Sequence, residues 1–145
     1  MWNGAMVAGA WHRTTGHSRA VLNPASGDTL AVVTDASVAT VSLAVDAARS
    51  AFPSWASRST ADRAEQLEAV ADAIAFHATA IAEIETLDTG KPLNQSVSDV
   101  RMAARYFRYY AHAAEHFFGD SIPSSSGMLV VTQREPYGVV AHITP

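Results

Sequence analysis

The apolar run Val139-Val140-Ala141, followed by Ile143, limits most strongly the folds that this chain can adopt. A short apolar run without polar alternation indicates a strand buried on both faces, as in a parallel sheet. Open α/β sheets bind ligands just beyond the carboxyl ends of such strands. We therefore expect an α/β fold. Because the sequence stops at Pro145, directly after this strand, we expect an incomplete domain.

The composition argues against several classes of protein. A formal net charge of -4 gives no electrostatic reason to expect nucleic acid or an anionic membrane as a partner. The chain contains no cysteine, which excludes disulfides, thiolate metal sites and cysteine nucleophiles within these residues. The first residues lack the pattern of a secretory signal, and no apolar run approaches a membrane span. We expect a cytoplasmic protein.

Hydrophobic spacing and turn residues predict the order of the elements. Residues 1–34 are β-like, with a hairpin around the turn from Asn23 to Asp28. Four helices should follow, and a strand is predicted over 128–134 before the strand at the end. The helices are expected to begin near Asp35 or Ser37, at Ser59, at Ala78 and near Gln95.

Local signals set the expected helix ends. Ser59 with Asp62 three residues later forms a short capping box. Gly90 stands where a helix terminates in the left-handed conformation. Pro53 should end the first helix, and the fourth should run to about Phe118.

One motif suggests a metal site. The sequence HAAEH, from His112 to His116, matches the H-x-x-E-H arrangement of zinc hydrolases. A catalytic zinc usually needs a third protein ligand, and the acids beyond Glu115 are limited to Asp120 and Glu135. The same face carries three arginines, whose charge repels a divalent cation. A solvated or subunit-facing polar stripe is therefore favoured over a zinc hydrolase.

Asp88 is unusual because it lies in the last turn of a predicted helix. A carboxylate there faces the negative end of the helix dipole. We expect a compensating partner, which could be Lys91, a backbone donor or a bound cation, although an exposed Asp88 without a role is also consistent.

Five segments together resemble the aldehyde dehydrogenase superfamily from about residue 20 onward. They are NPASGD, the stretch from Phe52 to Ile74, ETLDTGKPL from Glu85 to Leu93, the stretch from Asp99 to Ala111, and REP-x-GVV-x-x-I-x-P at the end. Each segment alone is moderately specific, and their order makes the resemblance strong.

The resemblance implies an oxidoreductase that converts an aldehyde to a carboxylic acid with NAD or NADP. In such enzymes a cysteine thiolate forms a thiohemiacetal, hydride passes to the nicotinamide, and a glutamate-activated water hydrolyses the thioester. An asparagine side chain, two residues after the proline that matches Pro145, helps form the oxyanion hole. None of these catalytic residues lies within this chain, so we expect it to be inactive alone.

The resemblance assigns roles to a few residues. Ile143, Thr144 and Pro145 match the strand end that lines the cofactor cleft. Met102 matches a position at the aldehyde entrance. The carboxylate of Asp88 and the backbone of Val21 resemble a site for a monovalent cation. The aldehyde itself is not identified, and neither is the choice between NAD and NADP.

The expected architecture is an N-terminal β-hairpin and a helical layer that lead into the first strand of a Rossmann-like sheet, with part of an oligomerisation arm. Residues 1–127 would belong to the NAD(P)-binding domain, 128–136 to the arm, and 137–145 to the truncated strand. By analogy the full-length protein would form a homodimer or homotetramer. The alternative is a non-catalytic helical module that uses the arm to bind partners.

Overall fold

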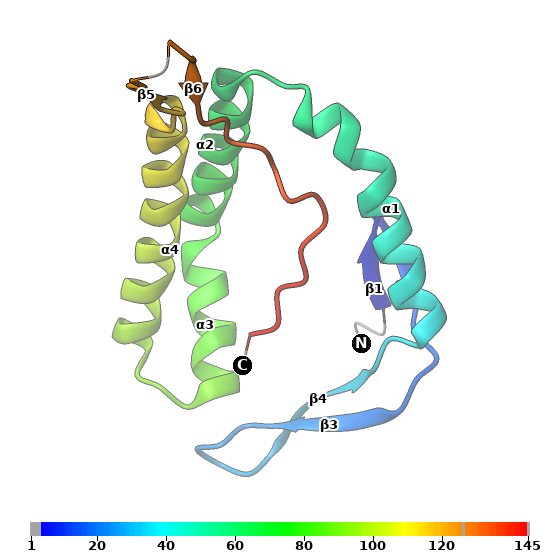
Figure 1. Cartoon of the computed structure of the whole chain (residues 1–145). Helices are drawn as coiled ribbons and strands as arrows, with labels where there is room; N and C mark the ends of the chain where they lie inside the picture. Colours follow the sequence, from blue (N-terminus) through cyan, green and yellow to red (C-terminus); the bar gives the residue numbers. More distant parts are fainter. Residues whose placement is uncertain (1–3, 126, 145) are drawn as a thin grey trace.

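The computed structural model describes residues 4–125 and 127–144. Two antiparallel hairpins come first (Figure 1). β1 (Gly4–Val7) pairs with β2 (Ala10–Arg13), and β3 (Ser18–Leu22) pairs with β4 (Thr29–Thr34). The second hairpin is the one predicted around residues 23–28, whereas the first was anticipated only as a β-like region.

Four α-helices follow, as predicted: α1 (Val38–Ala56), α2 (Thr60–Phe76), α3 (Ala78–Thr89) and α4 (Leu93–Ala113). The starts of α1 and α2 obey the local signals, whereas α3 and α4 begin without a side-chain cap and α4 begins two residues before the predicted Gln95. The Ser37 hydroxyl caps α1, and Ser59 and Asp62 form the expected capping box at α2. Gly90 ends α3 with φ at 75°, in the left-handed region that favours glycine.

Two predicted helix ends were wrong. Pro53 lies inside α1, and the Ser57 amide donates to the Pro53 carbonyl at 3.1 Å, so the helix continues past it. The φ that proline imposes is itself helical, and its cost falls on the turn before it. The fourth helix ends at Ala113 rather than near Phe118, and a 3₁₀ turn, η1 (Ala114–His116), follows.

Helices α2, α3 and α4 form a bundle in which α4 packs most extensively against α2 and then α3. The bundle core is made of small residues. Ala71, Ala82, Ala104 and Ala111 are at most 2% exposed, with Val100 beside them. The Thr86 and Ser96 hydroxyls lie 2.8 Å apart, and Ser96 is fully buried. Small side chains let helix axes approach closely, so the core is thin.

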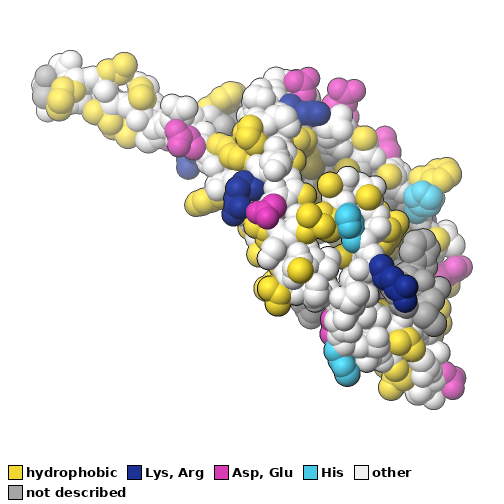
Figure 2. All heavy atoms as spheres, turned by 90° about the vertical axis from the view of Figure 1, so that its right-hand side faces the viewer, with side chains coloured by type: hydrophobic (Ala, Val, Ile, Leu, Met, Phe, Trp, Pro, Cys, Tyr) yellow, Lys and Arg dark blue, Asp and Glu magenta, His cyan; other side chains and the backbone are white. Residues whose placement is uncertain are grey.

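The strand predicted over 128–134 is much shorter in the structure. Only β6 (Val130–Val131) forms a ladder, with β5 (Ser121–Ile122). From here on the arm means the described residues 119–125 and 127–132, which include only part of the arm predicted over 128–136. It projects from the body at the upper left of Figure 2 and carries apolar side chains. Met128 and Leu129 near its tip are 65% and 82% exposed.

The strand predicted within 137–145 does not form in the described residues 137–144, and Pro145 lies outside them. A strand is defined by its partner, and no described segment pairs with residues 139–143. This part of the chain runs as an irregular segment from the arm to the C-terminal end (Figure 1). Val139 and Val140 line a hollow together with α1, as described below.

The chain exposes far more surface than a compact protein of its size. Its accessible surface is 11232 Å². A folded monomer of this mass is expected to expose roughly 7,200 Å², and its unfolded chain about 22,000 Å². The chain therefore buries about half of its unfolded surface, where about 70% is usual. Much of its apolar surface is thus free to contact other protein.

Candidate functional site

The corner between α3 and α4 holds the densest group of charged contacts. The Lys91 ammonium donates to Glu85 Oε1 at 2.7 Å and to Asp99 Oδ2 at 3.1 Å. Glu85 belongs to α3 and Asp99 to α4, so Lys91 ties the two helices together across the turn. The hydrogen bonds to Glu85 and then to Asp99 raise the pKa of Lys91 above its usual value of 10.5.

This raised pKa predicts a pH dependence of stability. A lysine whose pKa is higher in the folded state stabilises the fold fully below its unfolded pKa, and the contribution disappears as the pH rises through the folded value. We expect Lys91→Met to lower the urea midpoint at about pH 8, and the difference from wild type to shrink above about pH 10.5.

The matched control for this measurement is Arg108→Met. Arg108 makes a comparable cross-helix pair with Asp72 at 2.6 Å, but a guanidinium keeps its charge in this range. The effect of Arg108→Met should therefore stay constant between about pH 8 and pH 11. A Lys91→Met effect that is equally constant would contradict the assigned role of its ion pairs.

Asp88 does not pair with Lys91, which was one of its three expected partners. It is exposed, and its carboxylate makes no hydrogen bond or ion pair with any described residue. Val21 is half-buried in β3. The Asn23–Asp28 turn after β3 meets the end of α3, since a Cβ added to Gly90 would lie 2.9 Å from Pro24 Cγ.

The residues available at this corner suit a cation only in part. A carboxylate and backbone carbonyls are the oxygen ligands that hard cations prefer. The described residues contain no group of three or more His, Cys, Asp or Glu side chains that could hold a metal ion. A monovalent cation bound by Asp88 and the Val21 backbone stays a prediction.

Met102 lies on the outward side of α4 and is 43% exposed. The neighbouring Tyr106 and Tyr109, one and two turns further along, are 58% and 63% exposed. The exposure of the Met102 side chain is compatible with its expected position at an aldehyde entrance. The other walls of such an entrance are absent from the described residues, so the role stays a prediction.

The expected cofactor residues lie at the exposed end of the chain. Ile143 is 95% exposed, Thr144 is also exposed, and Pro145 is outside the described residues. Residues 143 and 144 could offer one wall of a dinucleotide cleft through their backbone. They form no cradle by themselves, and the structure does not bring them next to Met102 or Asp88 in any described contact.

The HAAEH motif does not form the expected helical pair. α4 ends at Ala113, so His112 belongs to the α-helix whereas His116 belongs to the 3₁₀ turn. His112 Nε2 lies 3.6 Å from Glu68 Oε1 on α2, which is a cross-helix contact. The spacing of one regular α-turn that a zinc hydrolase would use is therefore not present.

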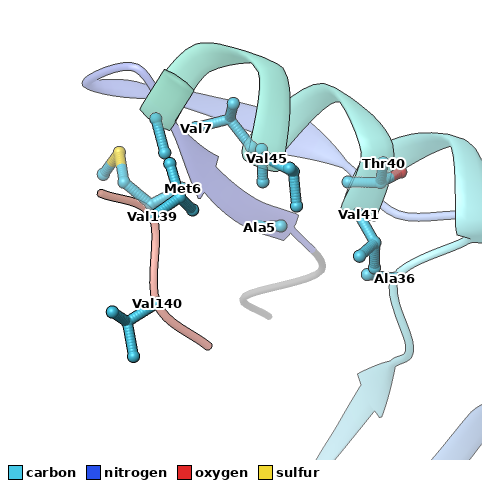
Figure 3. A pocket seen from close by; sticks show the side chains of 11 residues that line it. Ala5, Met6, Val7, Ala36, Thr40, Val41, Val45, Val139 and Val140 are labelled. Carbon is cyan, nitrogen blue, oxygen red and sulfur yellow. The ribbon is translucent and has the colours of Figure 1, made fainter. Parts of the chain in front are cut away.

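An apolar groove, here called the α1 groove, lies between β1, α1 and the C-terminal segment (Figure 3). One hollow of about 280 Å³ is lined by β1 residues, by the inner face of α1, and by Val139 and Val140. A second, of about 340 Å³, continues along α1 past Phe52 and Trp55. The two hollows share Ala48, Val139 and Val140.

Sequence reasoning missed the Lys91 group and the α1 groove. Lys91 is the sole lysine and directly follows a helix cap, which could have marked it as a helix-to-helix tie. No signal in the sequence indicates that residues 139–140 would line a hollow together with residues about 90 positions earlier.

Comparison with known proteins identifies the family to which this chain belongs. Residues 11–145 match the aldehyde dehydrogenase family. An aldehyde dehydrogenase from Enchytraeus buchholzi is 38% identical over 135 residues, which cover 90% of this chain and 27% of that protein. The 3,6-anhydro-alpha-L-galactose dehydrogenase of Streptomyces coelicolor is 38% identical over 142 residues, with 97% and 29% covered.

A solved structure resembles this chain in fold as well as in sequence. The crystal structure of PnpE in complex with nicotinamide adenine dinucleotide superposes with a TM-score of 0.85 at 34% identity. The superposition covers 94% of this chain and 28% of PnpE, so the chain spans less than a third of the length of these relatives. The chain belongs to the aldehyde dehydrogenase family and forms the N-terminal part of that fold.

Proposed function

We propose that this chain is the N-terminal part of an NAD(P)-dependent enzyme that oxidises an aldehyde to a carboxylic acid. The observation that carries the proposal is the match of nearly the whole chain to PnpE, a structure with NAD bound, at a TM-score of 0.85. Related sequences include dehydrogenases of different aldehydes, so the particular substrate is left open.

The proposed reaction follows the family chemistry. A cysteine thiolate adds to the aldehyde carbon, and the thiohemiacetal loses hydride to leave a thioester. Water, activated by a glutamate, releases the carboxylic acid and the thiolate. NAD or NADP, when bound, supplies the hydride acceptor. The nucleophile must come from outside this chain, because the chain has no cysteine.

The residues of this chain would then help to position the cofactor and to enclose the aldehyde. Ile143, Thr144 and Pro145 would line one side of the cofactor cleft, and Met102 would border the aldehyde entrance. Asp88 and the backbone of Val21 would hold a monovalent cation. These assignments rest on the resemblance and are compatible with the exposure of the described side chains.

The arm supports a proposal about partners. Leu129 and Val131 are 82% and 60% exposed, and a two-stranded ladder leaves both of its edges open to another strand. We infer that the full-length protein forms a homodimer or homotetramer through this arm. The same exposed residues favour the second candidate, a non-catalytic module that binds partners through the arm.

The remaining expectations concern location and other partners. No described helix combines the length and apolarity needed to cross a bilayer. A cytoplasmic location, without nucleic acid or membrane as a partner, is proposed from the sequence-based expectation alone.

A chimera tests the proposal. Residues 1–145 would replace the matched part of PnpE, and turnover would be followed by NADH or NADPH absorbance with several aldehydes. We expect the chimera to oxidise an aldehyde and to lose activity after thiol alkylation, whereas the isolated chain shows no turnover. An inactive but folded chimera would favour the non-catalytic module. Turnover by the isolated chain would overturn the placement of the nucleophile.

A further inference from the structure

Lys91 is the only lysine in the sequence, and all the other basic residues are arginines. The chain also has no cysteine. An aldehyde adds to a thiolate or to a neutral amine, whereas the guanidinium of an arginine keeps its proton and offers no free electron pair. Lys91 is therefore the one side chain of this sequence that can form an imine with a simple saturated aldehyde.

The structure holds the Lys91 amine as an ammonium ion between two carboxylates. Nζ lies 2.7 Å from Glu85 Oε1 and 3.1 Å from Asp99 Oδ2, so two of the N–H groups of the ammonium are used. The electron pair that attacks an aldehyde appears only after the ammonium loses a proton. That loss ends both ion pairs, so the hydrogen bonds to Glu85 and then to Asp99 raise the pKa of Lys91 and lower its neutral fraction.

Access to the Lys91 side chain is also restricted. The side chain is 26% exposed. Its backbone is fixed on both sides, since the Gly90 amide donates to the Thr86 carbonyl at 2.9 Å, and Pro92 has the φ of -59° that its ring imposes. The side chain therefore starts from a fixed point between α3 and α4, within reach of both carboxylates.

We propose that the ion pairs to Glu85 and Asp99 shield Lys91 from condensation with aldehydes, so that this part of the enzyme resists chemical modification by its own substrate. The inference rests on the proposed function, because that function brings the protein into contact with an aldehyde. It concerns the chemical durability of the chain and goes beyond the catalysed reaction.

The reaction that the ion pairs suppress has two steps. The free electron pair of a neutral amine adds to the carbonyl carbon, and a proton moves from nitrogen to oxygen, which gives a carbinolamine. Loss of that oxygen as water leaves a carbon–nitrogen double bond. A protonated imine nitrogen carries a single proton, so it keeps at most one of the two hydrogen bonds of Lys91. Modification would therefore loosen the corner between α3 and α4.

Trapping of the imine tests the proposal. Propanal and cyanoborohydride would be added near neutral pH to residues 1–145 and to the chimera with PnpE, and peptide mass spectrometry would follow the adduct at Lys91 with and without guanidinium chloride. We expect Lys91 to react at least about tenfold more slowly in the native protein, because each unit of pKa changes the neutral fraction of an amine tenfold.

The reference amine is the one introduced by Arg13→Lys. Arg13 is exposed in β2, and its side chain makes no hydrogen bond or ion pair with any described residue. Its replacement should react at the same rate, within a factor of about two, with and without denaturant. Equal rates at Lys91 with and without denaturant, in both proteins, would overturn the proposal.

A pair of variants separates the ion pairs from simple burial. Glu85→Gln removes the closer carboxylate and should raise the native rate at Lys91 at least about fivefold. Glu83→Gln is the matched control, because Glu83 is exposed on the same helix and pairs with no described residue. Equal rates in the two variants would overturn the proposal. The adduct is measured without turnover, so an inactive chimera would count against the proposed reaction and not against this shielding.

Discussion

Gly119→Ala is expected to disrupt the base of the arm. A Cβ at position 119 would lie 1.9 Å from the Thr132 carbonyl oxygen and 2.9 Å from its carbon. Both neighbours are backbone atoms, so the clash is relieved only if the two segments separate. The contacts at risk are the Thr132 amide to the Asp120 carbonyl, 2.9 Å, and the Asp120 amide to the Thr132 hydroxyl, 2.7 Å.

The size of this effect follows from the severity of the overlap. Overpacking a well-packed site costs typically about 1–3 kcal/mol, and a backbone overlap should lie at the upper end. If the arm mediates assembly, 3 kcal/mol corresponds to a self-association constant weakened about 100-fold. Sedimentation or light scattering of the full-length protein or the chimera measures this directly.

Ser121→Ala is the control for the arm. Ser121 is exposed in β5, and its side chain makes no hydrogen bond with any described residue. It should leave the association constant within a factor of about two. Unchanged assembly in Gly119→Ala would show that the arm does not carry the subunit interface, and would count against both the homo-oligomer and the arm-based module.

Ala71→Leu should destabilise the helical bundle. Ala71 is fully buried in α2, on the helix that makes the most extensive contact with α4. The fully buried residues of the bundle are mainly alanine, so a leucine at position 71 adds volume where the helices pack most closely. We expect a loss of about 1–3 kcal/mol, seen as a fall of about 1 M in the urea midpoint of the helical signal.

Ala75→Leu provides the comparison within the same helix. Ala75 is exposed one turn later, and Leu is nearly as good a helix former as Ala. Its effect should stay within about 0.5 kcal/mol. Equal effects of the two variants would mean that α2 does not pack against α4 through Ala71.

The caps and turns that depend only on neighbouring residues were predicted correctly. The capping box of Ser59 and Asp62, the left-handed Gly90 and the turn at residues 23–28 each depend on neighbours within a few positions. Such interactions form in the same way wherever the segment is placed in a fold. Two helix ends were exceptions. The fourth helix ended at Ala113 rather than near Phe118, and Pro53 did not end the first, because a proline near the end of a helix disfavours the preceding turn without stopping the residues that follow.

The arrangement of the predicted site residues could not be inferred from the sequence, because a site is assembled from segments that are far apart in the chain. Ile143, Thr144, Met102 and Asp88 are individually placed, but no described contact joins them. Lys91 was considered for Asp88, and it binds Glu85 and Asp99 instead. Which carboxylates Lys91 meets depends on how the chain turns from α3 into α4, which no local pattern specifies.

The amino-acid sequence alone determined the four helices, their caps and the family, because these depend on residue spacing and on motifs in a fixed order. Tertiary structure alone decided that Val139 and Val140 line a hollow beside α1 and form no strand. A β-strand needs a hydrogen-bonding partner, and no described segment supplies one to these residues, which stay exposed beside an apolar surface. That surface belongs to a helix about 90 residues earlier in the chain, and its position is set by the fold.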